Sequence, residues 1–264
     1  DFSDDENKLE DIINNFSFKI KLIKVIDKKW INPVIPYNIG FQNIHPKTEY
    51  IVIQNPEIFH CGDIFEHLLN NIKEDEYYTY PVFTSPHYIY NEELYKIKDN
   101  YFNNFISRID YNFFHFDYDF YKKKYPDIKD LEYRQAYLHY FNIERIQKRM
   151  CNKYNIFYTT RFIEDFKGWY NHKVHNPSNY HFLSALHKKT LHTIGGFCEE
   201  MKDGYWYDDN DFLNRLKKSS NVKLIDSNIY LGIHQYHDNG LGETFKRKNF
   251  KELTQQNKSI LHKN

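Results

Sequence analysis

Apolar residues along the chain follow two spacings, one typical of helices and one typical of strands. Segment 8–16 places its apolar residues on one helical face, and segment 18–26 begins by alternating, which predicts a strand. Segment 50–54 is a continuous, β-branched apolar run of the kind found in strands that are buried on both faces. A helix at about 62–72 and a strand at 77–83 follow. This alternation predicts an α/β fold built on a mainly parallel sheet that is flanked by helices.

The middle of the chain breaks this rhythm. Residues 86–155 are dense in Tyr, Phe, Asn and Lys, with a helix start at 125–128 and one or two helices over 131–149, so we expect a helical insertion. After it, the pattern predicts the following elements: a strand at 180–186, a helix at 188–194, a helix ending near 218, and strands at 222–225 and 229–234. Pro33 and Pro36 are expected to bracket a turn. The predicted parts are 1–85, 86–155, 156–240 and a polar tail at 241–264 that could form one weak helix.

Composition limits which classes of partner and cellular setting suit this chain. The chain has 264 residues with 36 basic and 36 acidic side chains, so no bulk charge favours nucleic acid as a partner. Its three widely spaced cysteines form neither a metal pattern nor a disulfide framework, which suggests a reducing, cytoplasmic setting. The chain contains no apolar run of about 18 residues or more, so the sequence predicts no membrane span. The chain starts without Met, which suggests a fragment that has lost upstream residues.

Three carboxylates gather within four positions, at Asp208, Asp209 and Asp211, just before a helical pattern. Acidic residues are favoured in the first turn of a helix, so the group could simply start that helix. A cap needs only one such residue, however, and crowded carboxylates are usually kept for a cation, a base or a polyhydroxyl ligand. Both interpretations stay open from spacing alone.

These residues carry a resemblance to a family. The order Gly195-Gly196-Phe197, then 208–212 with Arg215, then Ile233-His234 resembles the acceptor half of family-2-like GT-A fold glycosyltransferases. It is most similar to the galactosyltransferase-type C-terminal segment of beta-galactosyltransferases and chondroitin-type polymerases. The insertion, with its Pro126-Asp127, also resembles a small helical module found in various glycosyltransferases, where it would serve as a docking unit or as a spacer.

The N-terminal half carries weaker matches. Asp1 and Ser3 stand where the family has an Asp-Asp-Gly-Ser-x-Asp motif, and Asn38-Ile39-Gly40 matches Arg-Asn-x-Gly with Tyr37 in place of Arg. Asn55-Pro56-Glu57 occupies the place of the Asp-x-Asp, so one charged oxygen ligand remains there instead of two. By this resemblance, the chain is expected to begin at the end of the family's second strand, so that the first nucleotide-binding strand would have no counterpart in it.

The resemblance implies a metal-dependent hexosyltransferase. It would move a sugar from a nucleotide donor, most simply a UDP-sugar, to a hydroxyl of a glycan or protein acceptor, with inversion. It implies donor binding by Asp1, Ser3, Asn38, Gly40, Asn55 and Glu57, and a Mn²⁺ or Mg²⁺ ion held by Glu57 and His234, with His237 as a possible substitute. It implies that Asp209 is the base and Asp208 its partner, and that the acceptor is bound by Gly195, Gly196, Trp206, Asp208 and Trp169.

Alternatives remain for several of these residues. Asp211 and Arg215 are expected to form an ion pair that holds the loop. The aromatic residues could stack on sugars or simply pack in the core, and the two glycines could form a plain helix end. His172, His175 and His181 lack a cysteine or carboxylate partner set, so a zinc site is not favoured. A degenerate, non-catalytic domain that binds sugars or proteins is the alternative to an enzyme.

Overall fold

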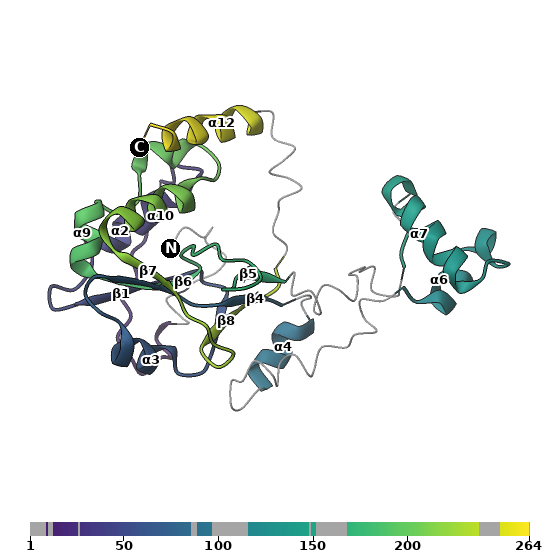
Figure 1. Ribbon diagram of the computed structural model, residues 1–264, viewed down its shortest axis with the longest axis horizontal. Coiled ribbons are helices and arrows are strands. Elements are labelled where there is room, and N and C mark those ends of the chain that lie inside the picture. The colour runs from purple at the N-terminus through teal and green to yellow at the C-terminus, as the bar shows by residue number, and fades with distance from the viewer. Residues whose placement is uncertain are drawn as a thin grey trace.

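The computed structural model describes residues 9, 13–25, 27–85, 89–96, 116–147, 149–151, 168–237 and 249–263. Within these residues the protein is a mixed α/β structure with two four-stranded sheets and helices packed around them (Figure 1). This confirms the α/β class. No helix in the described part of the chain is long and apolar enough to cross a membrane.

Strands that follow one another in the sequence often belong to different sheets. The first sheet has the order β1 (Tyr50–Gln54), β6 (Leu183–His187), β3 (Glu76–Thr79) and β7 (Asn221–Leu224). The second has the order β2 (Ile58–Cys61), β8 (Leu231–His234), β4 (Val82–Thr84) and β5 (Trp169–Asn171). The chain therefore steps from the first sheet to the second between β1 and β2, between β3 and β4, and between β7 and β8.

The expectation of a mainly parallel sheet is wrong. Among the described strands, only β3 with β7 and β4 with β8 are parallel, and the other neighbouring pairs are antiparallel. The predicted single strand at 77–83 is also two strands, because the chain leaves the first sheet at Tyr80-Pro81. Apolar runs report burial and not strand direction, so the pattern alone could not distinguish these arrangements.

Helices cover both faces of the first sheet. Ile51 and Ile53 share one core with residues of α2 (Val34–Gln42), α9 (Lys188–Ile194) and α10 (Asp208–Ser219). Tyr50 and Val52 pack instead with the core around Leu68 of α3 (Ile64–Asn71). The alternation of side chains along β1 thus divides them between the two helical layers. Because β1 lies at a sheet edge and Val52 is only half-buried, β1 is less enclosed than expected.

Two N-terminal expectations fail. The described residues of 18–26 form no strand and are exposed or half-buried, although their apolar and polar positions alternate. Pro33 and Pro36 do not bracket a turn: Pro33 is the N-cap of α2 and Pro36 lies in its first turn. Proline is tolerated there because the first N–H groups of a helix have no intrahelical acceptor.

The C-terminal predictions hold better. Helix α9 ends at Gly195 in a left-handed conformation, as a glycine C-cap does, and α10 begins at Asp208. The polar tail contains a helix, α12 (Phe250–Leu261), that packs beside α10 and the 3₁₀ helix η3 (Glu199–Asp203) (Figure 1).

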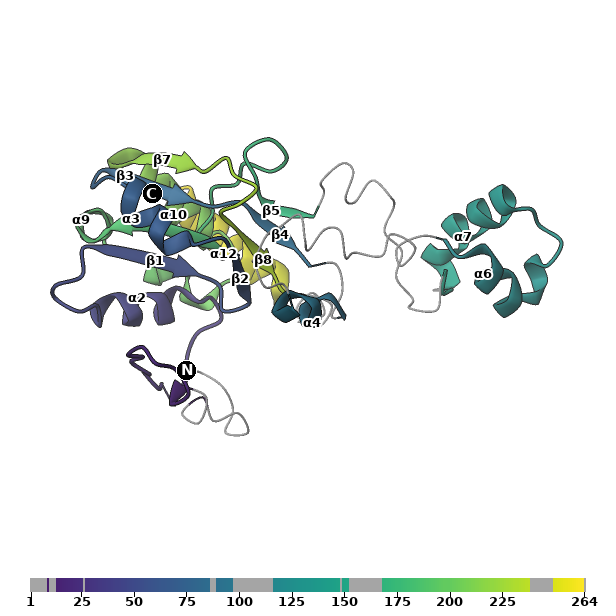
Figure 2. The same ribbon diagram turned by 90° about the horizontal axis from the view of Figure 1, so that it is seen from below.

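The elements described within segment 86–155 are helices. It contains α4 (Ile89–Lys96), α6 (Tyr118–Lys124), the 3₁₀ helix η2 (Pro126–Ile128) and α7 (Tyr133–Gln147). Helices α6 and α7 bury a small core of their own that includes Tyr121, Ile128, Ala136 and Tyr140. Both views draw these two helices apart from the sheets (Figures 1 and 2). They therefore form a separate helical unit.

Two glycines should respond oppositely to substitution by alanine. Gly40 is exposed within α2, and a Cβ atom there would meet nothing within 4 Å. Gly196 has a φ of +76°, and its Cβ would lie 2.6 Å from Asn38 Oδ1. In denaturant unfolding, Gly40→Ala should stabilise the protein by about 1 kcal/mol, and Gly196→Ala should destabilise it by at least that amount. Equal effects of the two substitutions would contradict the backbone described here.

Candidate functional site

A cleft of about 380 Å³ opens between the start of α10, the start of α2 and the turn that joins β1 to β2. It brings together residues that are far apart in sequence: Asn32, Tyr37, Asn55, Glu57, His181, Trp206, Asp208 and Asp209 line it, with their immediate neighbours. Five of the predicted site residues meet here, from both predicted halves of the fold. The cleft is therefore the candidate site.

Asp208 and Asp209 form one wall. Helix α10 starts at Asp208 immediately after two non-glycine residues in the left-handed region, Trp206 at a φ of 61° and Tyr207 at 68°. The α10 N-cap, Tyr207, makes no side-chain capping hydrogen bond. Asp208 is 8% exposed, and Asn32 Nδ2 donates a hydrogen bond to its Oδ1 at 2.9 Å. This carboxylate is held by a residue from another part of the chain, which a simple helix start would not require.

The two carboxylates have different surroundings. Burial raises the pKa of Asp208, and the negative charge of Asp209 raises it further, while the hydrogen bond from Asn32 and the proximity of His181 act against this. The side chain of Asp209 is 30% exposed and lines the cleft beside His181. Asp209 is therefore the more accessible of the two, while burial and the neighbouring charge oppose the ionisation of Asp208.

His181 is the neighbour of Asp209. Its Nδ1 lies 3.0 Å from Asp209 Oδ1, although the two atoms do not have hydrogen-bond alignment. Its ring is 4% exposed and stands edge-on to the rings of Tyr37, Phe197 and Phe212. The sequence pattern pointed only to a disfavoured zinc site for His181. The alternating pattern around His181 predicts the start of a strand, and it does not indicate that Asp209 would be its neighbour.

Glu57 lines the cleft and lies beside two histidines that are not among the lining residues. Glu57 Oε1 lies 3.0 Å from His234 Nε2 and 3.5 Å from His237 Nε2. The pairing of β2 with β8 places Ile58 opposite His234, which brings the predicted ligands together. The hydrogen bond from His234 lowers the pKa of Glu57; burial opposes this, while a backbone hydrogen bond and the two histidines add to the lowering. One carboxylate and two imidazoles with ligand atoms within 4.8 Å of one another suit a divalent cation.

Tyr37 lies between the two sides. Burial raises the pKa of its hydroxyl, and the negative charges of Asp209, Asp208 and Glu57 raise it further, in that order. Its ring stacks on Phe197 with centroids 4.7 Å apart. Tyr37 stands where the resembled family has Arg, so a neutral hydroxyl replaces a cation among three carboxylates. The motif resemblance identified the change from Arg to Tyr37 but did not indicate that Tyr37 would lie near these carboxylates.

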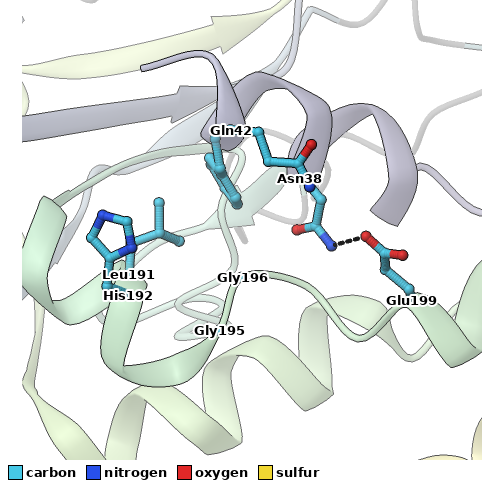
Figure 3. A pocket seen from close by; sticks show the side chains of 8 residues that line it. Asn38, Gln42, Leu191, His192, Gly195, Gly196 and Glu199 are labelled. Atoms are coloured by element: carbon cyan, nitrogen blue, oxygen red, sulfur yellow. Dashed lines mark hydrogen bonds between the residues drawn. The ribbon is translucent and has the colours of Figure 1, made fainter. Parts of the chain in front are cut away.

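Asn38, Gly195 and Gly196 lie outside the cleft lining and around a second cavity of about 240 Å³ (Figure 3). Asn38 Oδ1 accepts a hydrogen bond from Phe197 N at 2.8 Å. Its Nδ2 donates to Phe197 O and to Glu199 Oε1, both at 2.9 Å. Asn38 therefore holds the turn after Gly196, a structural task that the motif resemblance did not indicate.

The predicted pair of Asp211 and Arg215 is confirmed. Arg215 Nη2 lies 2.6 Å from Asp211 Oδ2, and Arg215 Nη1 donates to the carbonyl oxygens of Ile194 and Gly196. The pair thus ties the first turn of α10 to the glycine turn. Asp211 belongs to the framework, and only Asp208 and Asp209 of the acidic run face the cleft.

The remaining predicted residues fall in different places. Trp206 is 46% exposed at the cleft, whereas Trp169 is buried against Phe83 and His172 and does not line it. Gly40 is on the exposed side of α2 and is not part of the lining. Asp1 and Ser3 lie outside the described residues.

The other histidines serve a loop. His172 Nδ1 accepts hydrogen bonds from the backbone N–H groups of Val174 and His175, and the His172 and His175 rings stack. In the described part of the chain, the groups with metal-ligand spacing are Glu57 with His234 and His237, and His181 with Asp208 and Asp209. Neither group contains His172 or His175.

Comparison with known proteins adds no assignment. No protein-family model matches the chain, and no curated protein matches it significantly. The site is therefore interpreted from its own geometry and from the motif resemblance.

Asp208→Asn should stabilise the protein at neutral pH. The pKa of Asp208 is raised in the folded state, so ionising this carboxyl group destabilises the folded protein. This loss of stability is absent below the unfolded pKa of about 3.9 and grows as the pH rises from that value through the folded pKa. The substitution should therefore raise the melting temperature at pH 7 by about 2–4 °C, and this gain should vanish near pH 3.5. Asp226→Asn, at an exposed position, is the matched control. A loss of stability at pH 7 would show that ionised Asp208 is fully compensated.

Proposed function

We propose that the protein is a metal-dependent hexosyltransferase of the inverting kind. It would transfer a sugar from a UDP-sugar or related nucleotide donor to a hydroxyl group of a glycan or protein. The observation that carries the proposal is the cleft lined both by an accessible carboxylate, Asp209, and by Glu57, which forms a group with two histidines just outside the lining. Such a site has a base on one side and a cation-binding group near the other.

The cation side would bind the donor. Glu57, His234 and His237 would hold the ion, and two imidazole ligands favour Mn²⁺ over Mg²⁺. When bound, the ion would neutralise the charge that builds on the leaving diphosphate. Asn55 lines the cleft near Glu57 but carries no charge, so the histidines would supply ligands in place of the missing first Asp of the Asp-x-Asp.

The acidic side would bind and activate the acceptor. Asp209 would take the proton from the attacking hydroxyl as the bond to the anomeric carbon forms and the bond to the diphosphate breaks. Asp208 would hold the acceptor through its oxygen atoms, and Trp206 would stack on a sugar face at the rim. A single displacement of this kind inverts the anomeric configuration.

The acidic run fits this proposal better than a helix cap. Asp208 is buried with a raised pKa beside a second carboxylate, which is an unfavourable arrangement for stability. Strain and perturbed pKa values of this sort cluster at functional sites.

A non-catalytic sugar- or protein-binding domain is the second candidate. The observation in its favour is Asn55, which leaves Glu57 as the only carboxylate in the cation group. In that case the cleft would still bind a ligand through Trp206 and the acidic wall, but no sugar would be transferred.

Nucleotide and cation binding can be measured by thermal shift. UDP with Mn²⁺ should stabilise the full chain more than either alone. The total stabilisation should be about 2.7 kcal/mol when the ligand is at a hundredfold excess over its Kd. Mg²⁺ should act more weakly. Glu57→Gln should remove the Mn²⁺ increment, while Glu66→Gln, an exposed carboxylate change on α3, should keep it. No stabilisation by nucleoside diphosphates with any of these cations would contradict the proposal.

Transfer can be tested by the release of UDP from a panel of UDP-sugars with candidate acceptors. Asp209→Asn should reduce the rate by about 10²- to 10⁴-fold, because a general base contributes an acceleration of this size. The affinity for UDP and Mn²⁺ should not change, because their ligands lie on the other side of the cleft. Asp226→Asn again serves as the control. Undiminished turnover by Asp209→Asn would exclude Asp209 as the base, and absent turnover in the unmodified protein would favour the binding domain.

A further inference from the structure

The C-terminal helix α12 packs against the loop that carries Trp206. The Phe250 ring lies 5.1 Å from the Trp206 ring and 5.2 Å from the Tyr205 ring, measured between centroids. The backbone N–H of Tyr205 donates to Leu253 O. A segment that the sequence pattern classed as a polar tail thus packs against the loop that contributes Tyr205 and Trp206 to the cleft lining.

Asn257 is the polar centre of this contact. Its side chain is fully buried, and its Nδ2 donates hydrogen bonds to Met201 O and Trp206 O, both at 3.0 Å. The backbone passes so close that a Cβ atom on Gly204 would lie 2.1 Å from Asn257 Oδ1. One amide therefore bridges the middle of η3 and the residue that begins the left-handed pair.

The left-handed pair needs such support. Trp206 and Tyr207 both have positive φ, which costs about 1–2 kcal/mol for each residue with a β-carbon. The Trp206 carbonyl accepts from Asn257 and also, at 3.4 Å, from Asn32, which holds Asp208 with the same amide nitrogen. The conformation that aims Trp206 and starts α10 is thus maintained by tertiary hydrogen bonds.

We infer that Asn257 is a positioning residue for the acceptor side of the cleft. It acts through the Trp206 carbonyl to fix the Trp206 ring and the start of α10, where Asp208 and Asp209 stand. This inference rests on the proposed function for the role of the acceptor. The cation ligands Glu57 and His234 belong to β2–β8 and its adjoining turn, so donor and cation binding do not depend on Asn257.

The test compares Asn257→Ala with Gln256→Ala, a neighbouring amide that is exposed on the same helix. Hydrogen exchange measured by mass spectrometry on the full chain should show that amides in 204–209 exchange at least tenfold faster in Asn257→Ala, while those in 231–235 do not change. In transfer assays the KM for the acceptor should rise at least tenfold, with kcat changed less than threefold and Mn²⁺ affinity unchanged. Gln256→Ala should match the unmodified protein in every measurement.

Phe250→Leu provides a second variant if Asn257→Ala fails to fold, as judged by lost Mn²⁺ binding and lost cooperative unfolding. It removes the ring contact with Trp206 but keeps the Asn257 hydrogen bonds, and it should raise the acceptor KM with a smaller effect on exchange. Unchanged exchange in 204–209 or an unchanged acceptor KM in the folded variants would overturn the inference. Absent UDP, Mn²⁺ and transfer signals in the unmodified protein would instead overturn the proposed function, and hydrogen exchange would still report on the contact itself.

Discussion

Two adjacent carboxylates at the start of α10 are the constraint on which the site depends. Asp208 is buried next to Asp209, so both desolvation and repulsion oppose its ionisation. The groups that offset this come from separate parts of the chain: the Asn32 amide before α2, and His181 before β6. The left-handed Trp206 and Tyr207 add backbone strain at the same point. Folding has to bring all of these together, and only then can the two acids share one wall.

Side-chain hydrogen bonds hold the framework around that wall where the chain turns. Arg215 joins Asp211 to the carbonyls of the glycine turn, and Asn38 holds both the N–H and the carbonyl of Phe197 on the other side of that turn. The Phe197 ring in turn stacks between Tyr37 and Phe212. Residues that the motif resemblance assigned to substrates thus hold Phe197, one of the rings that contact His181.

The division of the strands between two sheets separates the two sides of the site. The acidic wall rests on helices that cover the first sheet, while Glu57 and His234 stand where β2 pairs with β8 in the second. Glu57 follows β1 at the point where the chain steps between the sheets, so it reaches the cleft from the opposite direction.

Local sequence determined much of this protein. Periodicity located the helix after β2, the helices of the insertion, and α9 with its glycine end, because amphipathic spacing and capping are properties of neighbouring residues. Spacing also identified the pair of Asp211 with Arg215 and singled out Glu57, Asp208 and Asp209. Strand direction, the break at Tyr80-Pro81 and the coil at 19–25 were not accessible, because pairing partners lie far away in sequence.

Only the tertiary structure decided which residues share the cleft. It added Asn32 and Tyr37 to the lining and made His181 the neighbour of Asp209, while it placed Asn38, Gly196 and Trp169 elsewhere. It also set α12 behind Trp206, with Asn257 buried against the loop. A pattern along the chain records burial and local geometry, but the contact of two distant side chains depends on how sheets and helices pack. That packing is why the acidic run could be found from the sequence and its surroundings could not.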